Sequence, residues 1–117
     1  MTEASTCART VTWAGGTDVF DLSHPWVRSV LSVRGLPGSN GSTPAACLAR
    51  FHDGAYSLDD CERVIELGLI GGGKTRSEAT KLLNDHVRGK PIAPIAPIAF
   101  EILAALFVGA SRDNASA

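Results

Sequence analysis

Residues 68–75 read G-L-I-G-G-G-K-T and match the phosphate-binding pattern G-x-x-x-x-G-K-[ST] at every fixed position. In such a loop, backbone N–H groups cradle the phosphates of a nucleotide and the lysine adds positive charge. This chemistry requires a buried strand before the loop and a helix after it, with the positive end of the helix facing the anion. The motif therefore raises the hypothesis of a small nucleotide-binding or regulatory module.

The segment before this loop has the pattern of a helix and not of a strand. Ser57 is a typical N-cap, and acidic residues follow in the first turn, where negative charge suits the helix dipole. The apolar positions recur at the spacing of one helix face: Leu58, Cys61, Val64, Ile65 and Leu69. Glu66 interrupts the apolar run that a buried strand would need. We expect this helix to end at Gly68–Leu69.

The glycines of the motif then have a structural explanation. Gly71, Gly72 and Gly73 are interpreted as the turn between two helices, with at least one of them at a positive φ. Thr75 and Glu78 form a capping box for the following helix, which gives Thr75 a local role that does not involve a metal ion.

Other residues that could do chemistry do not form a recognisable set. Zinc could be held by Cys47, His52, Cys61 and His86, but they include no C-x-x-C or H-x-x-x-H pair. Acids suited to a metal-dependent nuclease occur at Asp59, Asp60 and Glu62, where the helix dipole explains them. Ser23 and Ser57 have no nearby base and are interpreted as caps. We expect no catalytic residue, no metal, no cofactor and no enzyme activity.

Size and composition narrow the class of protein. The 117 residues predict a single domain over residues 1–110, with a disordered tail at 111–117. A nucleotide-hydrolysing domain needs several parallel strands, and no candidate strand follows Thr75. The net charge of −1 provides no basic excess for binding nucleic acid.

The same features predict the compartment. The start M-T-E-A-S-T-C lacks the basic and apolar regions of a signal peptide, and three cysteines in such a chain favour reduced thiols in the cytoplasm. The most apolar stretch, Ile95–Ala110, is interrupted by Pro97 and Glu101 and is short for a bilayer. We expect a buried helix there and no contact with a membrane.

Candidate β structure is confined to the N-terminal part. The segments Arg9–Trp13 and Thr17–Leu22 alternate polar and apolar residues around an Ala-Gly-Gly turn, which predicts a hairpin over about residues 8–22. Its expected buried side consists of Val11, Trp13, Val19 and Leu22. An isolated hairpin is only marginally stable, so we expect it to lie on the helices.

Four to five short helices are predicted over about residues 23–109, which makes the fold class α+β and mainly α. Asp21 or Ser23 is expected to cap the first helix, and Thr43 with Pro44 to start the second. The threefold repeat P-I-A over residues 91–99 suits an extended polyproline helix, followed by a last helix over Ile98–Val108. The expected inner faces are Trp26, Val27, Val30 and Leu31; Cys47, Leu48 and Phe51; and Ala79, Leu82, Leu83 and Val87.

The last helix is apolar on nearly all sides, and Glu101 is its only charged residue. A small domain has difficulty surrounding such a helix completely. We therefore expect part of it to contact a partner or a second copy of the chain, through Ile102, Leu106 and Phe107.

From Thr43 onward the chain shows a helix ending in G-L-I-G-G-G, a capped helix, a G-x-P turn and an Ala/Leu-rich last helix ending in glycine. This pattern resembles the small tail protein family of gene transfer agents, the phage-like particles of alphaproteobacteria, and with the hairpin the resemblance spans about nine-tenths of the chain. The positions that carry it are Gly68, Gly71, Gly72, Gly73, Glu78, Ala79, Leu82, Leu83, Val87, Gly89, Pro91, Ala99, Ile102, Leu103, Ala105 and Gly109.

The resemblance implies a non-enzymatic tail tube protein or tail assembly chaperone. Its partners would be other tail proteins, namely the tail tube subunit and the tape-measure protein, and it could be incorporated into a phage-like particle. Two other classes stay open at this stage: the nucleotide-binding module using residues 68–75, and a toxin–antitoxin-like or transcription-associated helical protein. The lack of a basic recognition helix counts against the last.

Overall fold

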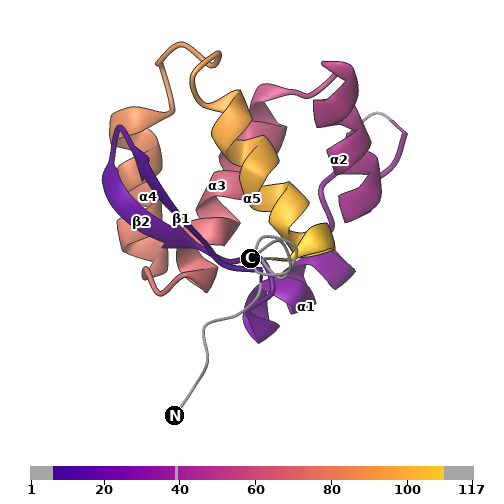
Figure 1. Ribbon diagram of the computed structural model, residues 1–117, viewed down its shortest axis with the longest axis horizontal. Helices are drawn as coiled ribbons and strands as arrows, with labels where there is room; N and C mark the ends of the chain where they lie inside the picture. Colours follow the sequence, from indigo (N-terminus) through magenta and orange to yellow (C-terminus); the bar gives the residue numbers. More distant parts are fainter. Residues whose placement is uncertain (1–6, 39, 110–117) are drawn as a thin grey trace, which may run out of the picture.

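The computed structural model describes residues 7–38 and 40–109. A two-stranded antiparallel hairpin, β1 (Arg9–Trp13) and β2 (Gly16–Phe20), is followed by five helices in this part of the chain (Figure 1). The helices are α1 (Pro25–Val33), α2 (Pro44–Asp53), α3 (Leu58–Gly71), α4 (Arg76–His86) and α5 (Ala96–Val108). The predicted α+β, mainly α, fold class is confirmed.

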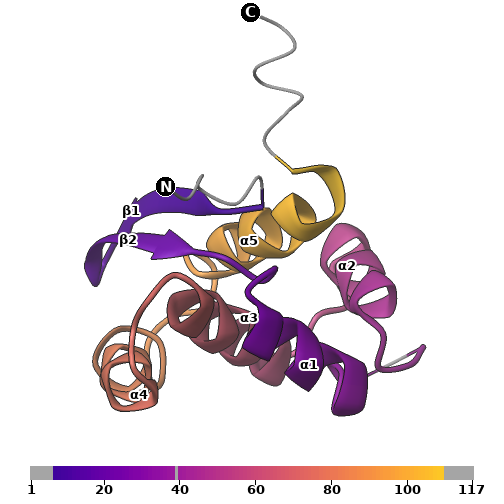
Figure 2. The same ribbon diagram turned by 90° about the horizontal axis from the view of Figure 1, so that it is seen from below.

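Helix α3 is the centre of the molecule. It contacts β2, α1, α4 and α5, with the hairpin on one side of it and α1 on the other (Figure 2). The side chains of Val64, Ile65 and Leu69 on this helix are completely buried. The predicted helical pattern before the glycine loop is therefore correct, and this helix organises the core.

The prediction of which residues form the buried side of the hairpin was partly wrong. Trp13, Phe20 and Leu22 are buried, but Val19 is exposed. The register pairs Val11 with Asp18 and Trp13 with Gly16, and side chains alternate along a strand. Asp18 and Phe20 therefore face the core and Val19 faces outward.

The predicted caps of three helices are confirmed. Thr43, Ser57 and Thr75 each accept a hydrogen bond from a backbone N–H of the first turn, and Ser57 and Thr75 belong to full capping boxes. The cap of α1 was predicted wrongly. His24, and not Asp21 or Ser23, accepts a hydrogen bond from the Trp26 backbone N–H. Asp21 instead accepts bonds from Ser23, which form the turn that precedes α1.

Two boundaries also differ from the sequence expectation. Helix α3 continues beyond Gly68–Leu69 to Gly71, with Gly72 as its C-cap. The P-I-A repeat is not an extended polyproline helix, because the N–H groups of Ile95 and Ala96 both donate to the Ile92 carbonyl and close a turn. Helix α5 therefore begins at Ala96, with Pro97 in its first turn, where the missing N–H costs no hydrogen bond.

Candidate functional site

The glycines of the G-L-I-G-G-G-K-T segment form a packing surface on α3. Gly68, Gly71 and Gly72 lie against β2 and against Asp21, the residue that follows β2. The Asp21 N–H donates to the Gly68 carbonyl at 3.0 Å. A Cβ atom on Gly71 would collide with the Asp21 carbonyl oxygen, and one on Gly72 with that of Val19. The missing side chains therefore let the strand and the helix backbones touch.

The three predicted turn glycines thus have different roles. Gly71 is the last residue of α3, and Gly72 has an ordinary φ of −83°. Gly73 alone of the three has a positive φ, at 117°, and a Cβ atom there would meet nothing within 4 Å. The chain turns at Gly73, whereas Gly71 and Gly72 are needed for close approach.

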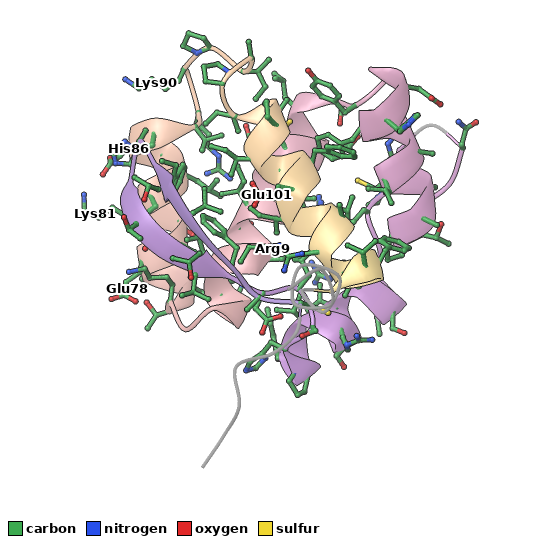
Figure 3. All side chains as sticks on the ribbon, viewed as in Figure 1. Arg9, Glu78, Lys81, His86, Lys90 and Glu101 are labelled. Atoms are coloured by element: carbon green, nitrogen blue, oxygen red, sulfur yellow. The ribbon has the colours of Figure 1, made fainter. Side chains whose placement is uncertain are left out.

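The backbone donors of this loop are already occupied. The N–H groups of Gly72, Gly73 and Lys74 donate to carbonyls of α3. The Thr75 N–H donates to the Glu78 carboxylate at 2.8 Å, and the Thr75 hydroxyl accepts from the Glu78 N–H. Glu78 lies at the start of α4 (Figure 3), so a negative charge already occupies the helix terminus that a phosphate would use.

Lys74 also has a partner within the fold. Its ammonium group lies 3.3 Å from the buried carboxylate of Asp18, which in turn accepts a hydrogen bond from Trp13 Nε1 at 2.8 Å. The lysine therefore neutralises a charge on the core face of the hairpin. The element that delivers the loop is helix α3 and not a strand, as the sequence predicted.

We predict that ATP and GTP, with or without magnesium, do not bind at physiological concentrations. The loop lacks free amide donors at Gly72 to Thr75, and its lysine is engaged with Asp18. Isothermal titration calorimetry checks this. A dissociation constant below about 100 μM, roughly −5.5 kcal/mol, that is lost in Lys74→Ala would contradict the prediction.

A buried ion pair that the sequence did not reveal lies between α2 and α3. Arg50 and Asp60 are each 2 % exposed, and the guanidinium group donates from Nε and Nη2 to the two carboxylate oxygens at 2.8 and 2.7 Å. Arg50 also donates to the carbonyls of Leu36 and Gly41, which lie in the loop between α1 and α2. Asp60 additionally accepts the Ser57 N–H. The pair therefore holds that loop and two helices together.

The ion pair sets the charge state of Asp60. Burial by itself raises the pKa of this carboxyl, but hydrogen bonds from Arg50 and Ser57, together with the Arg50 charge, lower the pKa below its ordinary value. Asp60 is consequently a charged structural group. The sequence contained a signal that Arg50 is buried, since Arg50 lies three residues after Cys47 on the apolar face of α2. It contained none for Asp60, whose charge the helix dipole alone explained.

The candidate zinc ligands do not come together. Among residues 7–38 and 40–109, no three His, Cys, Asp or Glu side chains form a group that could hold a metal ion. His52 is exposed beside Asp53, and the His86 ring packs against Trp13. Burial raises the pKa of the Cys47 thiol to about 12 and that of Cys61 to about 11, so both thiols are protonated near neutral pH and are poor nucleophiles.

Only part of the predicted contact surface of α5 is accessible. Phe107 is 47 % exposed and Leu106 is half-buried, but Ile102 is 1 % exposed and lies in the core. Ile102 is therefore not available for a partner contact, because the face of α5 that carries it packs on α3, where its Cγ2 atom lies 3.1 Å from the place of a Gly68 Cβ.

A groove borders this end of α5. We call it the α1–α5 groove; it has a volume of about 420 Å³ and is lined by Arg28, Leu31, Ser32, Thr43, Pro44, Ala45, Leu106 and Phe107. Three helices meet there: α1, the start of α2 and the end of α5. The backbone carbonyl of Gly109, just after α5, accepts a hydrogen bond from Arg9 of β1 at 2.7 Å, which fixes the position of this helix end.

A search of protein-family models matched residues 6–109 to the family described as phage tail tube protein, GTA-gp10. The match covers the hairpin, all five described helices and the glycine loop. The chain belongs to this family. The resemblance seen in the sequence is thereby confirmed, and the phage tail tube family is a structural one.

Membership of this structural family agrees with the packing role of Gly68, Gly71 and Gly72 against the hairpin. Neither the search of curated proteins nor the search of solved structures found a match to this chain. In the part of the chain that the structure describes, no helix has the length and apolar character needed to cross a membrane.

Proposed function

We propose that this tail tube family member acts without catalysis, as a tail component or tail assembly chaperone of a gene transfer agent, through contacts of the α1–α5 groove with another tail protein. The observation that carries the proposal is the exposed Phe107, which lines a groove of about 420 Å³. Exposed aromatic residues beside a concave apolar surface are typical anchors of protein interfaces.

The expected partner is the tail tube subunit or the tape-measure protein, and a second copy of this chain is the other candidate. Assembly would take place in the cytoplasm, and the protein would be incorporated into the particle or released afterwards. The nucleotide-binding alternative has no support, because the donors of the 72–75 segment are occupied within the fold.

We predict that Phe107→Asp weakens the capture of tail proteins. The substitution removes the aromatic contact area, and the new carboxylate must give up its hydration when a partner covers it, so we expect at least tenfold weaker binding, about 1.4 kcal/mol. The measurement is co-expression of the tagged chain with the neighbouring tail genes, followed by pull-down and light scattering of the complex.

The matched control is Leu58→Asp. Leu58 is 61 % exposed, does not line the groove, and lies in the first turn of α3, where an acid suits the helix dipole. Both variants should keep the melting temperature of the parent protein. Equal capture by Phe107→Asp and Leu58→Asp, or no capture by the parent chain, would contradict the proposed contact.

A further inference from the structure

A second groove, on another side of α1, combines arginines with an apolar floor. We call it the arginine groove; it has a volume of about 200 Å³ and is lined by Trp26, Val30, Arg34, Arg63, Glu66, Leu67, Ile70 and Arg76. The residues come from α1 and the residue after it, from α3, and from the first position of α4. We infer that this groove binds an acidic segment of a partner protein, with an apolar side chain inserted beside Trp26.

The charge of the groove supports an acidic occupant. Three guanidinium groups and one carboxylate line it, and none of the three arginines forms an ion pair with an acidic residue in the described part of the chain. Arg88, which follows α4, is by contrast paired with Glu62 of α3. Guanidinium groups match carboxylates in a two-pronged geometry. Arg34, Arg63 and Arg76 are therefore positioned to take up carboxylates supplied from outside.

The apolar part of the groove supports a peptide as the occupant. Trp26 was expected on the inner face of the first helix, but it is 42 % exposed, and Val30 and Ile70 are half-buried beside it. Trp and Arg are the residue types that most often dominate interface energies. A volume of about 200 Å³ is smaller than the usual pocket for a small-molecule ligand, roughly 300 Å³ or more, but it admits a side chain.

The groove is poorly suited to nucleic acid. Glu66 lies among the arginines, and the chain as a whole has a net charge of −1. Binding to a phosphate backbone depends on an extended basic surface. A protein segment with one or two carboxylates next to an apolar residue matches the groove better.

This inference rests on the proposed contact role, since it gives the chemistry of a second contact with a partner. It uses a different surface, however. Phe107 lines the α1–α5 groove only, and Arg63 lines the arginine groove only. The two proposals can therefore fail separately.

The test uses the full chain and three synthetic peptides with a central leucine–phenylalanine pair, flanked by glutamate, glutamine or lysine. Binding is followed by fluorescence polarisation of a labelled peptide and by the emission of Trp26, with Trp26→Phe as the spectral control. We expect the glutamate peptide to bind, the glutamine peptide to bind about tenfold more weakly, and the lysine peptide not to bind. Added salt should weaken the glutamate complex.

Arg63→Glu should weaken the glutamate peptide at least tenfold, and the uncharged variant Arg63→Gln should weaken it less. The matched control is Lys90→Glu, which makes the same charge change at an exposed residue at the opposite end of the molecule from α1 (Figure 3). Melting temperatures confirm that each variant is folded, and Arg34→Glu provides an independent second variant if Arg63→Glu is not.

Several results would overturn the inference. These are no binding of the glutamate peptide, equal binding of the glutamate and glutamine peptides, or equal losses in Arg63→Glu and Lys90→Glu. An oligonucleotide that displaces the peptide would make nucleic acid the occupant instead. A dimer of the parent chain that dissociates in Arg63→Glu would make it a second copy. Loss of tail-protein capture in Phe107→Asp with unchanged peptide binding would concern the proposed function alone.

Discussion

Asp60→Ala is expected to lower the free energy of unfolding by about 3–5 kcal/mol, because removal of one partner leaves the Arg50 charge buried without compensation. Domains of this kind are stable by only about 5–15 kcal/mol, so this loss is a large fraction of the total stability. Arg50 loses both of its carboxylate contacts, and the Ser57 cap loses the side chain that accepts its N–H.

Urea denaturation monitored by circular dichroism measures the effect. The matched control is Asp59→Ala, which removes the neighbouring acid from the same helix turn, where it is exposed. Its effect should be within about 1 kcal/mol, the size of a helix-dipole contribution. Equal effects of the two substitutions would show that the buried pair does not stabilise the fold.

The same pair predicts a dependence of stability on pH. The pKa of Asp60 is lowered in the folded protein, so the stability that it contributes is fully present above the unfolded pKa, about 3.9. That contribution is lost as the pH falls through the lower, folded pKa. The difference in unfolding free energy between the parent chain and Asp60→Ala should therefore shrink below about pH 4 and be constant from there to neutral pH.

Gly71→Ala and Gly72→Ala are expected to be the most damaging changes in the glycine loop, each costing about 3 kcal/mol or more. The added Cβ atom would overlap a backbone carbonyl, that of Asp21 or of Val19. A backbone carbonyl cannot rotate away as a side chain can, so the hairpin must move off α3. Loss of this contact also exposes Phe20, which is fully buried.

Gly73→Ala is the internal comparison, and its effect should be smaller, about 1–3 kcal/mol, because it adds only strain at a positive φ. Thermal melting of the three variants gives the order directly. If Gly73→Ala were the most destabilising of the three, the loop would be a turn whose backbone conformation matters more than its contact with β2.

Local structure was largely determined by the sequence. The caps at Thr43, Ser57 and Thr75 and the helical spacing before the glycine loop depend on neighbours within four residues, so they could be predicted without knowledge of the fold. The helix before the loop was also enough to count against a phosphate-binding site. The same reasoning wrongly predicted that Val19 is buried, because the face of the hairpin on which its side chain lies depends on the register with β1.

The tertiary structure decided which surfaces are free. The surplus of apolar residues in α5 was visible in the sequence, but only packing on α3 shows that Ile102 is buried and Phe107 exposed. The Arg50–Asp60 pair and the arginine groove join residues that lie 10 to more than 40 positions apart in the chain. Local spacing can place one member of such a pair on an apolar face, as it does Arg50, but it does not identify the partner, because the distance between the two is set by how the helices pack.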